Sequence, residues 1–243
     1  MRKTLGILLF LICVSVCVPS EGFSYSLAGD WSNAINPNGP WSYNAGNDPL
    51  PFNIANWPIG EFGQEQTAWA YSNDPGTFIP GWLKSVADPD QSVRPYDFLA
   101  GDVLVHSTDA TNGSGFGSAN VTWTNETSGF YNIDGGLWMP RQLGKSNDWG
   151  LYLDGTLLAS GSLFDGDIYS RSNPDLFNIQ GINILKGSVL KLELVKTSLD
   201  GDFVGVNFNI DPGVNPVPEP ASILLLGLGG AGLAIRRRFQ KNA

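Results

Sequence analysis

The chain has 243 residues, with 14 Lys and Arg against 23 Asp and Glu and a formal net charge of −9. Six of the basic residues lie in the two end segments, so the body between residues 25 and 217 has 8 basic against 21 acidic side chains, about −13. This acidic balance argues against nucleic acid as a partner, because a negative surface repels phosphate.

The start of the chain, residues 1–24, has the layout of a secretory signal peptide. Two basic residues precede an apolar run from Leu5 to Val18, and small or polar residues follow it. The only two cysteines, Cys13 and Cys17, lie in this segment, so the exported body has no disulfide. We therefore expect a hydrophobic core to stabilise the body.

Residues 25–212 are predicted to form one all-β domain, a single β-sandwich of the jelly-roll type. Asp154-Gly155 lies between two apolar segments and is a strong hairpin signal. The first part of the body is rich in Trp, Pro and Asn and shows little periodicity. Apolar residues alternate with period two in five later segments, at 103–106, 121–124, 149–153, 190–194 and 204–210.

Patterns typical of catalysis are sparse, and we expect no catalytic residue. His106 is the only histidine and lies beside Val105 in a predicted strand, where a structural role is favoured. Glycoside hydrolysis needs two carboxylates and no histidine, so it is the enzyme alternative. The candidate carboxylates are Glu61, Glu65, Glu126 and Glu193.

No cofactor or metal site is expected, with a structural calcium ion as the alternative. Three pairs of aspartates in turns could supply the hard oxygen ligands that calcium prefers, although none completes a twelve-residue calcium loop. Aspartate is also common in turns for conformational reasons. The pairs are Asp88 with Asp90, Asp165 with Asp167, and Asp200 with Asp202.

Tryptophan side chains are the candidate glycan-binding residues, because an indole ring stacks on the apolar face of a sugar. Trp138 and Trp149 flank the loop MPRQLGKSND and are predicted to lie on one rim of the sandwich, and Trp41 is the third candidate. Packing in the core is the alternative for each ring, since the domain has no disulfide.

The C-terminus has three parts in a fixed order. A proline-rich linker, residues 213–220, ends in Pro218-Glu219-Pro220, and residues 221–235 contain no charge. As a helix this uncharged stretch would be about 22 Å long, a short membrane span. Basic residues follow it, which predicts that the body lies outside the membrane. These stop-transfer residues are Arg236, Arg237 and Arg238.

This order closely resembles the PEP-CTERM sorting signal of bacterial proteins that are exported alongside exopolysaccharide systems. The resemblance implies that exosortase, a membrane protease, recognises Pro218, Glu219 and Pro220 and removes residues 221–243. It also implies a precursor held transiently in the membrane by residues 221–235, and a product at the cell surface or in the extracellular matrix.

A second resemblance covers about residues 30–211. The run from Asn36 to Tyr43, the segment from Gly101 to His106, and VTWTNETSGFYNIDGGLW are similar to a module found in PEP-CTERM surface proteins. That module is a jelly roll resembling carbohydrate-binding sandwiches. The module usually has the sequence His-Pro-Gly at the position where this chain has His106-Ser107-Thr108.

Together these features predict a non-catalytic, secreted protein that associates with extracellular polysaccharide. The alternatives are a glycoside hydrolase and an adhesin with protein partners.

Overall fold

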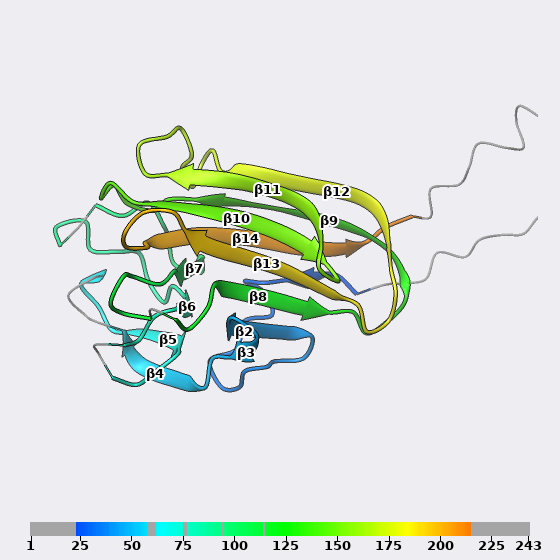
Figure 1. The fold of residues 1–243 in the computed structure, drawn as a ribbon, viewed down its shortest axis with the longest axis horizontal. Helices are drawn as coiled ribbons and strands as arrows, with labels where there is room; N and C mark the ends of the chain where they lie inside the picture. The colour runs from blue at the N-terminus through cyan, green and yellow to red at the C-terminus, as the bar shows by residue number, and fades with distance from the viewer. Residues whose placement is uncertain (1–22, 58–61, 75–76, 94, 114, 215–243) are drawn as a thin grey trace, which may run out of the picture.

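The fold is an all-β sandwich of two antiparallel sheets, as the alternation predicts (Figure 1). Residues 1–22 of the predicted signal peptide, the PEP-CTERM segment and its predicted hydrophobic helix lie outside the described residues. Within the described part of the chain, no helix is long and apolar enough to cross a membrane. The computed structural model describes residues 23–57, 62–74, 77–93, 95–113 and 115–214.

The first sheet, sheet A, has eight strands. β1 pairs with β14 beside the main path of the sheet. In spatial order the path is β12 (Asp175–Ile184), β9 (Gly129–Trp138), β14 (Phe203–Pro212), β7 (Val103–His106), β6 (Gly81–Lys84), β5 (Gln66–Ala70) and β4 (Phe52–Trp57), and β1 is Tyr25–Ser26.

The second sheet, sheet B, has six strands and packs face to face on sheet A. Its order is β11 (Thr156–Phe164), β10 (Ser146–Leu153), β13 (Val189–Lys196), β8 (Ala119–Thr124), β2 (Trp41–Ala45) and β3 (Asp48–Pro49).

The main core lies between the sheets and follows from the period of a strand. Successive side chains point to opposite faces, so alternating apolar residues all face the other sheet. Val121, Leu151 and Leu192 lie on three neighbouring strands of sheet B and are fully buried. Opposite them, Val206 and Ile210 of β14 belong to the same cluster. The five predicted alternating segments thus correspond to β7, β8, β10, β13 and β14.

The hairpin predicted at Asp154-Gly155 joins β10 to β11. Both turn residues have positive φ, 49° for Asp154 and 81° for Gly155. These angles suit the tight turn that matches the right-handed twist of two paired strands.

A second apolar cluster covers the outer face of sheet A at β4 to β7. It is largely aromatic and is separate from the main core. β4, β5 and β6 are regular strands in the part of the body where the sequence predicted little regular structure. Layers on both faces explain the difference for β5 and β6, because a strand buried on both sides has no polar face to alternate with, whereas β4 is an edge strand whose residues are largely exposed. The described members are Trp57, Phe62, Ala68, Ala70, Phe78, Ile79, Leu83, Tyr96, Phe98, Leu104 and Phe203.

Candidate functional site

A cleft of about 740 Å³ lies at one end of the sandwich. Three loops form it: the β6–β7 connection, the β9–β10 connection and the β11–β12 connection. These loops lie at the left end of the molecule in Figure 1. The volume lies in the range of small-molecule and cofactor sites.

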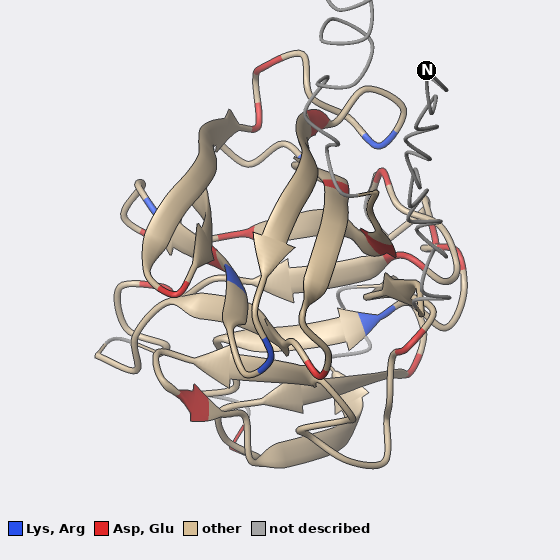
Figure 2. Cartoon of the chain, turned by 90° about the vertical axis from the view of Figure 1, so that its right-hand side faces the viewer, with Lys and Arg blue, Asp and Glu red and all other residues tan. Residues whose placement is uncertain are grey.

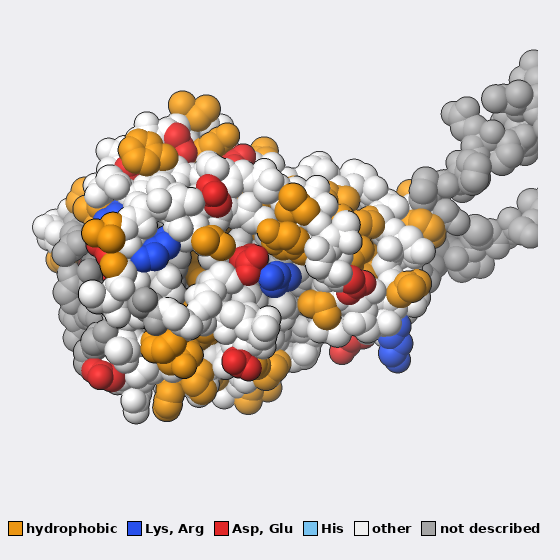
Figure 3. Space-filling model, in the orientation of Figure 1, with side chains coloured by type: hydrophobic (Ala, Val, Ile, Leu, Met, Phe, Trp, Pro, Cys, Tyr) orange, Lys and Arg blue, Asp and Glu red, His pale blue; other side chains and the backbone are white. Residues whose placement is uncertain are grey.

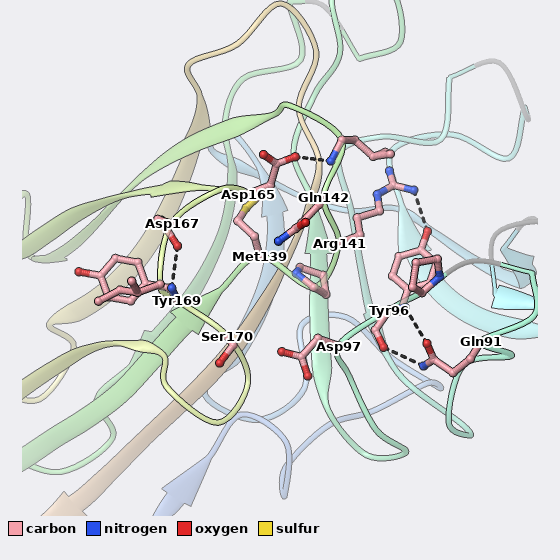
Figure 4. A pocket seen from close by; sticks show the side chains of 14 residues that line it. Gln91, Tyr96, Asp97, Met139, Arg141, Gln142, Asp165, Asp167, Tyr169 and Ser170 are labelled. Atoms are coloured by element: carbon pink, nitrogen blue, oxygen red, sulfur yellow. Dashed lines mark hydrogen bonds between the residues drawn. The ribbon is translucent and has the colours of Figure 1, made fainter.

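The cleft has aromatic and polar walls around an apolar floor. Figure 4 shows Tyr169 with Asp167 on one side and Tyr96 with Gln91 on the other. Between them, residues 139–143 supply the buried Met139 together with polar side chains. This loop is the one that the sequence predicted at a rim of the sandwich.

Asp165 fixes the loop between β9 and β10. Its Oδ2 accepts the backbone N–H groups of three successive residues, Leu143, Gly144 and Lys145. Gly144 has a φ of 71°, a left-handed conformation that glycine adopts readily. The carboxylate is buried, at 7% exposure, so it acts as an internal clamp on the loop.

Arg171 ties the β11–β12 loop to the β6–β7 loop. Its backbone N–H donates to Asp97 Oδ2 at 2.8 Å. Its guanidinium forms a two-point pair with Asp102, with Nε–Oδ2 at 2.5 Å and Nη2–Oδ1 at 3.1 Å. Two-point geometry fixes orientation as well as distance. The two loops that face each other across the cleft are therefore braced before any ligand binds.

A buried ion pair lies behind the cleft. Arg141 Nε contacts Asp202 Oδ1 at 2.5 Å, and Arg141 Nη1 donates to the hydroxyl of Tyr96 at 2.7 Å. The guanidinium also lies 5.1 Å from the centroid of the Phe203 ring. Burial raises the pKa of Asp202, and the Arg141 charge opposes that rise. Arg141 thus links the cleft to the second apolar cluster.

Tyr169 is the aromatic side chain of the cleft that is partly open to solvent. Asp167 Oδ1 accepts the backbone N–H of Tyr169 at 2.7 Å, which orients the residue. The negative charge of Asp175 raises the pKa of the Tyr169 hydroxyl, with partial burial as the second cause. A hydrogen bond to the Asp175 side chain also raises this pKa, so the hydroxyl hydrogen is directed to that carboxylate and the phenol oxygen can accept a hydrogen bond.

Gln142 offers an exposed amide to the cleft. An amide has donors and an acceptor, so it complements a hydroxyl group in either direction. Gln91 is engaged differently, because it bonds the backbone of Tyr96 through Nε2 at 2.8 Å and Oε1 at 3.2 Å. Gln142 can therefore contact a ligand in the cleft, whereas Gln91 supports the backbone of Tyr96.

Trp138 lies behind the cleft, with only 4% of its surface exposed. Its ring covers Gly205, its direct partner on β14, where an added Cβ would lie 2.1 Å from Trp138 Cε2. Its Nε1–H donates to the carbonyl of Asp97 at 2.8 Å. Trp138 thus supports a wall of the cleft while its ring is covered.

The other two candidate tryptophans are also buried. Trp149 is 4% exposed and donates its Nε1–H to Asp175 Oδ2 at 2.8 Å, so it holds the carboxylate that acts on Tyr169. Trp41 is fully buried and donates to Asp30 Oδ2 at 3.1 Å. It lies beside a smaller hollow and contacts no part of the cleft.

Three of the four candidate hydrolytic carboxylates lie in the described part of the chain, and each is away from the cleft. Glu61 lies outside the described residues, and none of the other three lines the cleft. Glu126 is exposed in the β8–β9 turn, whereas Glu193 on β13 pairs with Lys191 at 3.0 Å and accepts the Ser118 hydroxyl. Glu65 is exposed immediately before β5.

His106 is a structural imidazole, as its predicted strand position favours. It is buried, and its Nδ1 lies 2.6 Å from the carbonyl oxygen of Ser107. The ring also meets Phe203 edge-on at 4.5 Å between centroids.

The paired aspartates contact protein donors. Asp88 accepts the N–H of Ala100, and Asp90 accepts both the N–H and the hydroxyl of Ser92. Asp200 pairs with Lys145 at 3.0 Å. Among the residues that the structure describes, no three histidine, cysteine or acidic side chains converge as a metal site would require.

Solved structures that resemble this chain include several carbohydrate-binding modules. One is the CBM36-1 domain of a multidomain xylanase from the hindgut metagenome of Trinervitermes trinervoides, with 12% identity, 49% of this chain and 81% of that chain covered, and a TM-score of 0.31. Another is a family 35 carbohydrate-binding module from Clostridium thermocellum, with 12% identity, 48% and 81% covered, and a TM-score of 0.29.

A third is a CBM36 module in complex with calcium and xylotriose, with 13% identity, 46% and 79% covered, and a TM-score of 0.27. Among curated proteins, none matches this chain. Residues 216–238 match the PEP-CTERM protein-sorting motif. The chain therefore carries a PEP-CTERM sorting motif on the C-terminal side of an all-β sandwich. This motif implies export and processing by exosortase.

Proposed function

We propose that this chain is an exported, non-catalytic protein that binds polysaccharide at the cell surface through the cleft beside Tyr169. The observation that carries the proposal is the composition of the cleft: a partly open aromatic ring, an unengaged amide and carboxylates around an apolar floor. A sugar has the same division, with apolar C–H faces and a rim of hydroxyl groups. The sorting motif adds delivery to a compartment where such polymers occur.

Each wall of the cleft has a separate role in the proposal. Tyr169 stacks on the sugar, while Gln142 and the carboxylate of Asp97 bond its hydroxyl groups. Trp138 and Trp149 do not contact the sugar in this proposal. Their indole N–H groups hold Asp97 and Asp175 in place, through the Asp97 carbonyl and the Asp175 carboxylate. Bracing before binding favours affinity, because fewer side chains and loops lose freedom when the ligand enters.

Affinity gel electrophoresis with the host's own polysaccharide tests this proposal. The unmodified protein is expected to be retarded, and Tyr169→Ala is expected to weaken binding at least tenfold, whereas Tyr169→Phe keeps most of the stacking surface. Tyr152→Ala is the matched control, because Tyr152 is also partly exposed but lies on β10 against Lys191.

Three outcomes oppose the proposal. Equal mobility of the unmodified protein with and without polysaccharide contradicts the proposed binding. Release of reducing ends during incubation favours the hydrolase alternative. Retardation that Tyr152→Ala and Tyr169→Ala reduce equally places the binding surface elsewhere.

A further inference from the structure

The end of the sandwich opposite the cleft is the end from which the chain leaves. β14 runs from Phe203 beside the cleft loops to Pro212 at the far end. Val214 is the last described residue, and the sorting motif begins two positions later at residue 216. Whatever anchors the tail therefore acts on this end of the domain.

The rim of this end carries apolar side chains on three neighbouring strands. β12, β9 and β14 are adjacent in sheet A. At this end Leu185 follows the last residue of β12, Phe130 is the second residue of β9, and Val214 lies two residues after β14. Leu185 is 61% exposed and Val214 is 79% exposed. Adjacent strands are about 4.8 Å apart, so the backbones of these three positions lie along about 10 Å of rim. We call them the exit rim.

Backbone pairing places these residues together. Ile184 pairs with Gly129, so Leu185 lies beside the start of β9. The N–H of Gly213 donates to the carbonyl of Phe130 at 2.7 Å, which brings Val214 to the same position. Figure 3 shows hydrophobic side chains at the right-hand end of the domain, and Figure 2 looks onto this end.

The tether between the exit rim and the uncharged stretch is short. Six residues separate Val214 from Ala221, so their Cα atoms are seven steps apart, and a fully extended chain of about 3.6 Å per step spans at most about 25 Å. Residues 221–235 carry no charge, and three arginines follow them. While this stretch is in a bilayer, the exit rim cannot move far from the lipid surface.

We propose that the exit rim docks on the lipid surface of the membrane while the sorting segment is still attached. Lipid fits this rim better than a protein partner does, because the rim is small and the tether holds it at the interface. Apolar contact drives the docking, since the body carries a net charge of about −13 and is repelled by anionic headgroups. This proposal does not depend on polysaccharide binding.

Depth-dependent quenching of a fluorescent probe tests the docking in the full chain. With Cys13→Ser and Cys17→Ser, the chain has no other thiol, and Leu185→Cys accepts an environment-sensitive label. The matched control is Leu199→Cys, which is 78% exposed in the β13–β14 loop at the cleft end. The chain is placed in phosphatidylcholine vesicles that contain a spin-labelled lipid.

Quenching is expected to be at least threefold stronger at position 185 than at position 199. Val214→Glu should reduce quenching at 185 by about half, while the tail keeps the chain on the vesicles. Equal quenching at the two positions, or none at 185, overturns the proposal. So does a probe at 185 that is shielded from water but not quenched, which means that a second copy of the chain covers the rim.

Discussion

At the residue scale, Arg141 joins the cleft to the interior. Its side chain is 9% exposed and its partner Asp202 is fully buried, so both charges are largely removed from water. Asp202 Oδ2 has no hydrogen-bond partner within the described part of the chain. The contact between the Arg141 guanidinium and Asp202 Oδ1 therefore compensates most of the negative charge of Asp202. Removing one member of such a pair leaves a buried, uncompensated charge.

Arg141→Leu is expected to lower the free energy of unfolding by about 3–5 kcal/mol at pH 8. Without the guanidinium, the folded-state pKa of Asp202 rises further above its unfolded value. A carboxyl with a raised folded pKa retains its contribution to stability at low pH and loses it as the pH rises through that pKa. The difference between variant and unmodified protein should therefore shrink at pH 4.5, as measured by urea unfolding.

Lys191→Met is the control for this prediction. Lys191 pairs with Glu193 at 3.0 Å, but its side chain is 33% exposed, and an exposed pair of this kind contributes less than about 1 kcal/mol. A cost of Arg141→Leu that is the same at pH 4.5 and pH 8 would contradict the assignment of the effect to Asp202.

At the element scale, large aromatic side chains lie opposite glycines on neighbouring strands of sheet A. Phe177 of β12 pairs with Gly135 of β9, and Trp138 of β9 pairs with Gly205 of β14. An added Cβ at Gly135 would lie 2.4 Å from Phe177 Cζ. These glycines therefore provide space for rings within continuous strands.

This pairing explains part of what the sequence does not predict. Gly135-Gly136 interrupts the alternation of β9 and resembles a turn signal, whereas the strand runs through it for ten residues. β7, β8, β10, β13 and β14 were predictable because their apolar residues alternate without such gaps. β5 and β6 were not, because a second layer buries their outer face, and β4 was not, because an irregularity between Ile54 and Trp57 interrupts its alternation.

The candidate site was predictable only in outline. The loop from Met139 to Asp148 was placed on a rim because Trp138 and Trp149 flank it, and residues 139–143 do line the cleft. Tyr169 was missed, since Ile168 and Tyr169 form a lone apolar pair in a polar turn, with no periodicity to mark them. Only the fold brings that turn to the β9–β10 loop.

Gly205→Ala tests whether the pairing of ring and glycine positions the cleft. The new methyl group would overlap Trp138, so the indole must move and its bond to the Asp97 carbonyl should break. We expect a loss of about 1–3 kcal/mol in the free energy of unfolding, measured by urea titration, together with weaker polysaccharide retardation.

Gly129→Ala is the matched control on β9. The nearest atom to an added Cβ there is Tyr131 Cε2 at 3.7 Å, an ordinary contact distance, and Gly129 does not have positive φ. Its effect should stay within about 0.5 kcal/mol. Equal losses in the two variants would show that any added methyl group disturbs the sheet.

At the scale of the whole molecule, the cleft and the C-terminal end of β14 lie at opposite ends of the sandwich. β14 connects the two ends with ten residues, which span about 33 Å in a strand. A chain held at its C-terminus thus presents the cleft away from the membrane, where extracellular polymers are accessible. Acidic residues are spread along the chain, many of them in loops and near strand ends (Figure 2).

The short tether also predicts how the folded body affects processing. Five residues, 213–217, separate the end of β14 at Pro212 from Pro218, so the two are six steps apart and an extended tether reaches about 22 Å at most. A membrane protease must approach Pro218-Glu219-Pro220 within that distance of the folded sandwich. Deleting residues 213–215 should slow cleavage several-fold, because the sandwich then blocks the approach, whereas inserting six Gly and Ser residues after Asn215 should not slow it.

Mass spectrometry of the surface protein in the native host measures this effect. The unmodified product is expected to lack peptides beyond Glu219, and the deletion variant should accumulate chains that retain residues 221–243. The insertion variant controls for the change of sequence in the linker. Intact C-terminal peptides in the unmodified surface protein would contradict removal of the span, whereas equal cleavage of all three chains would contradict only the steric limit set by the sandwich.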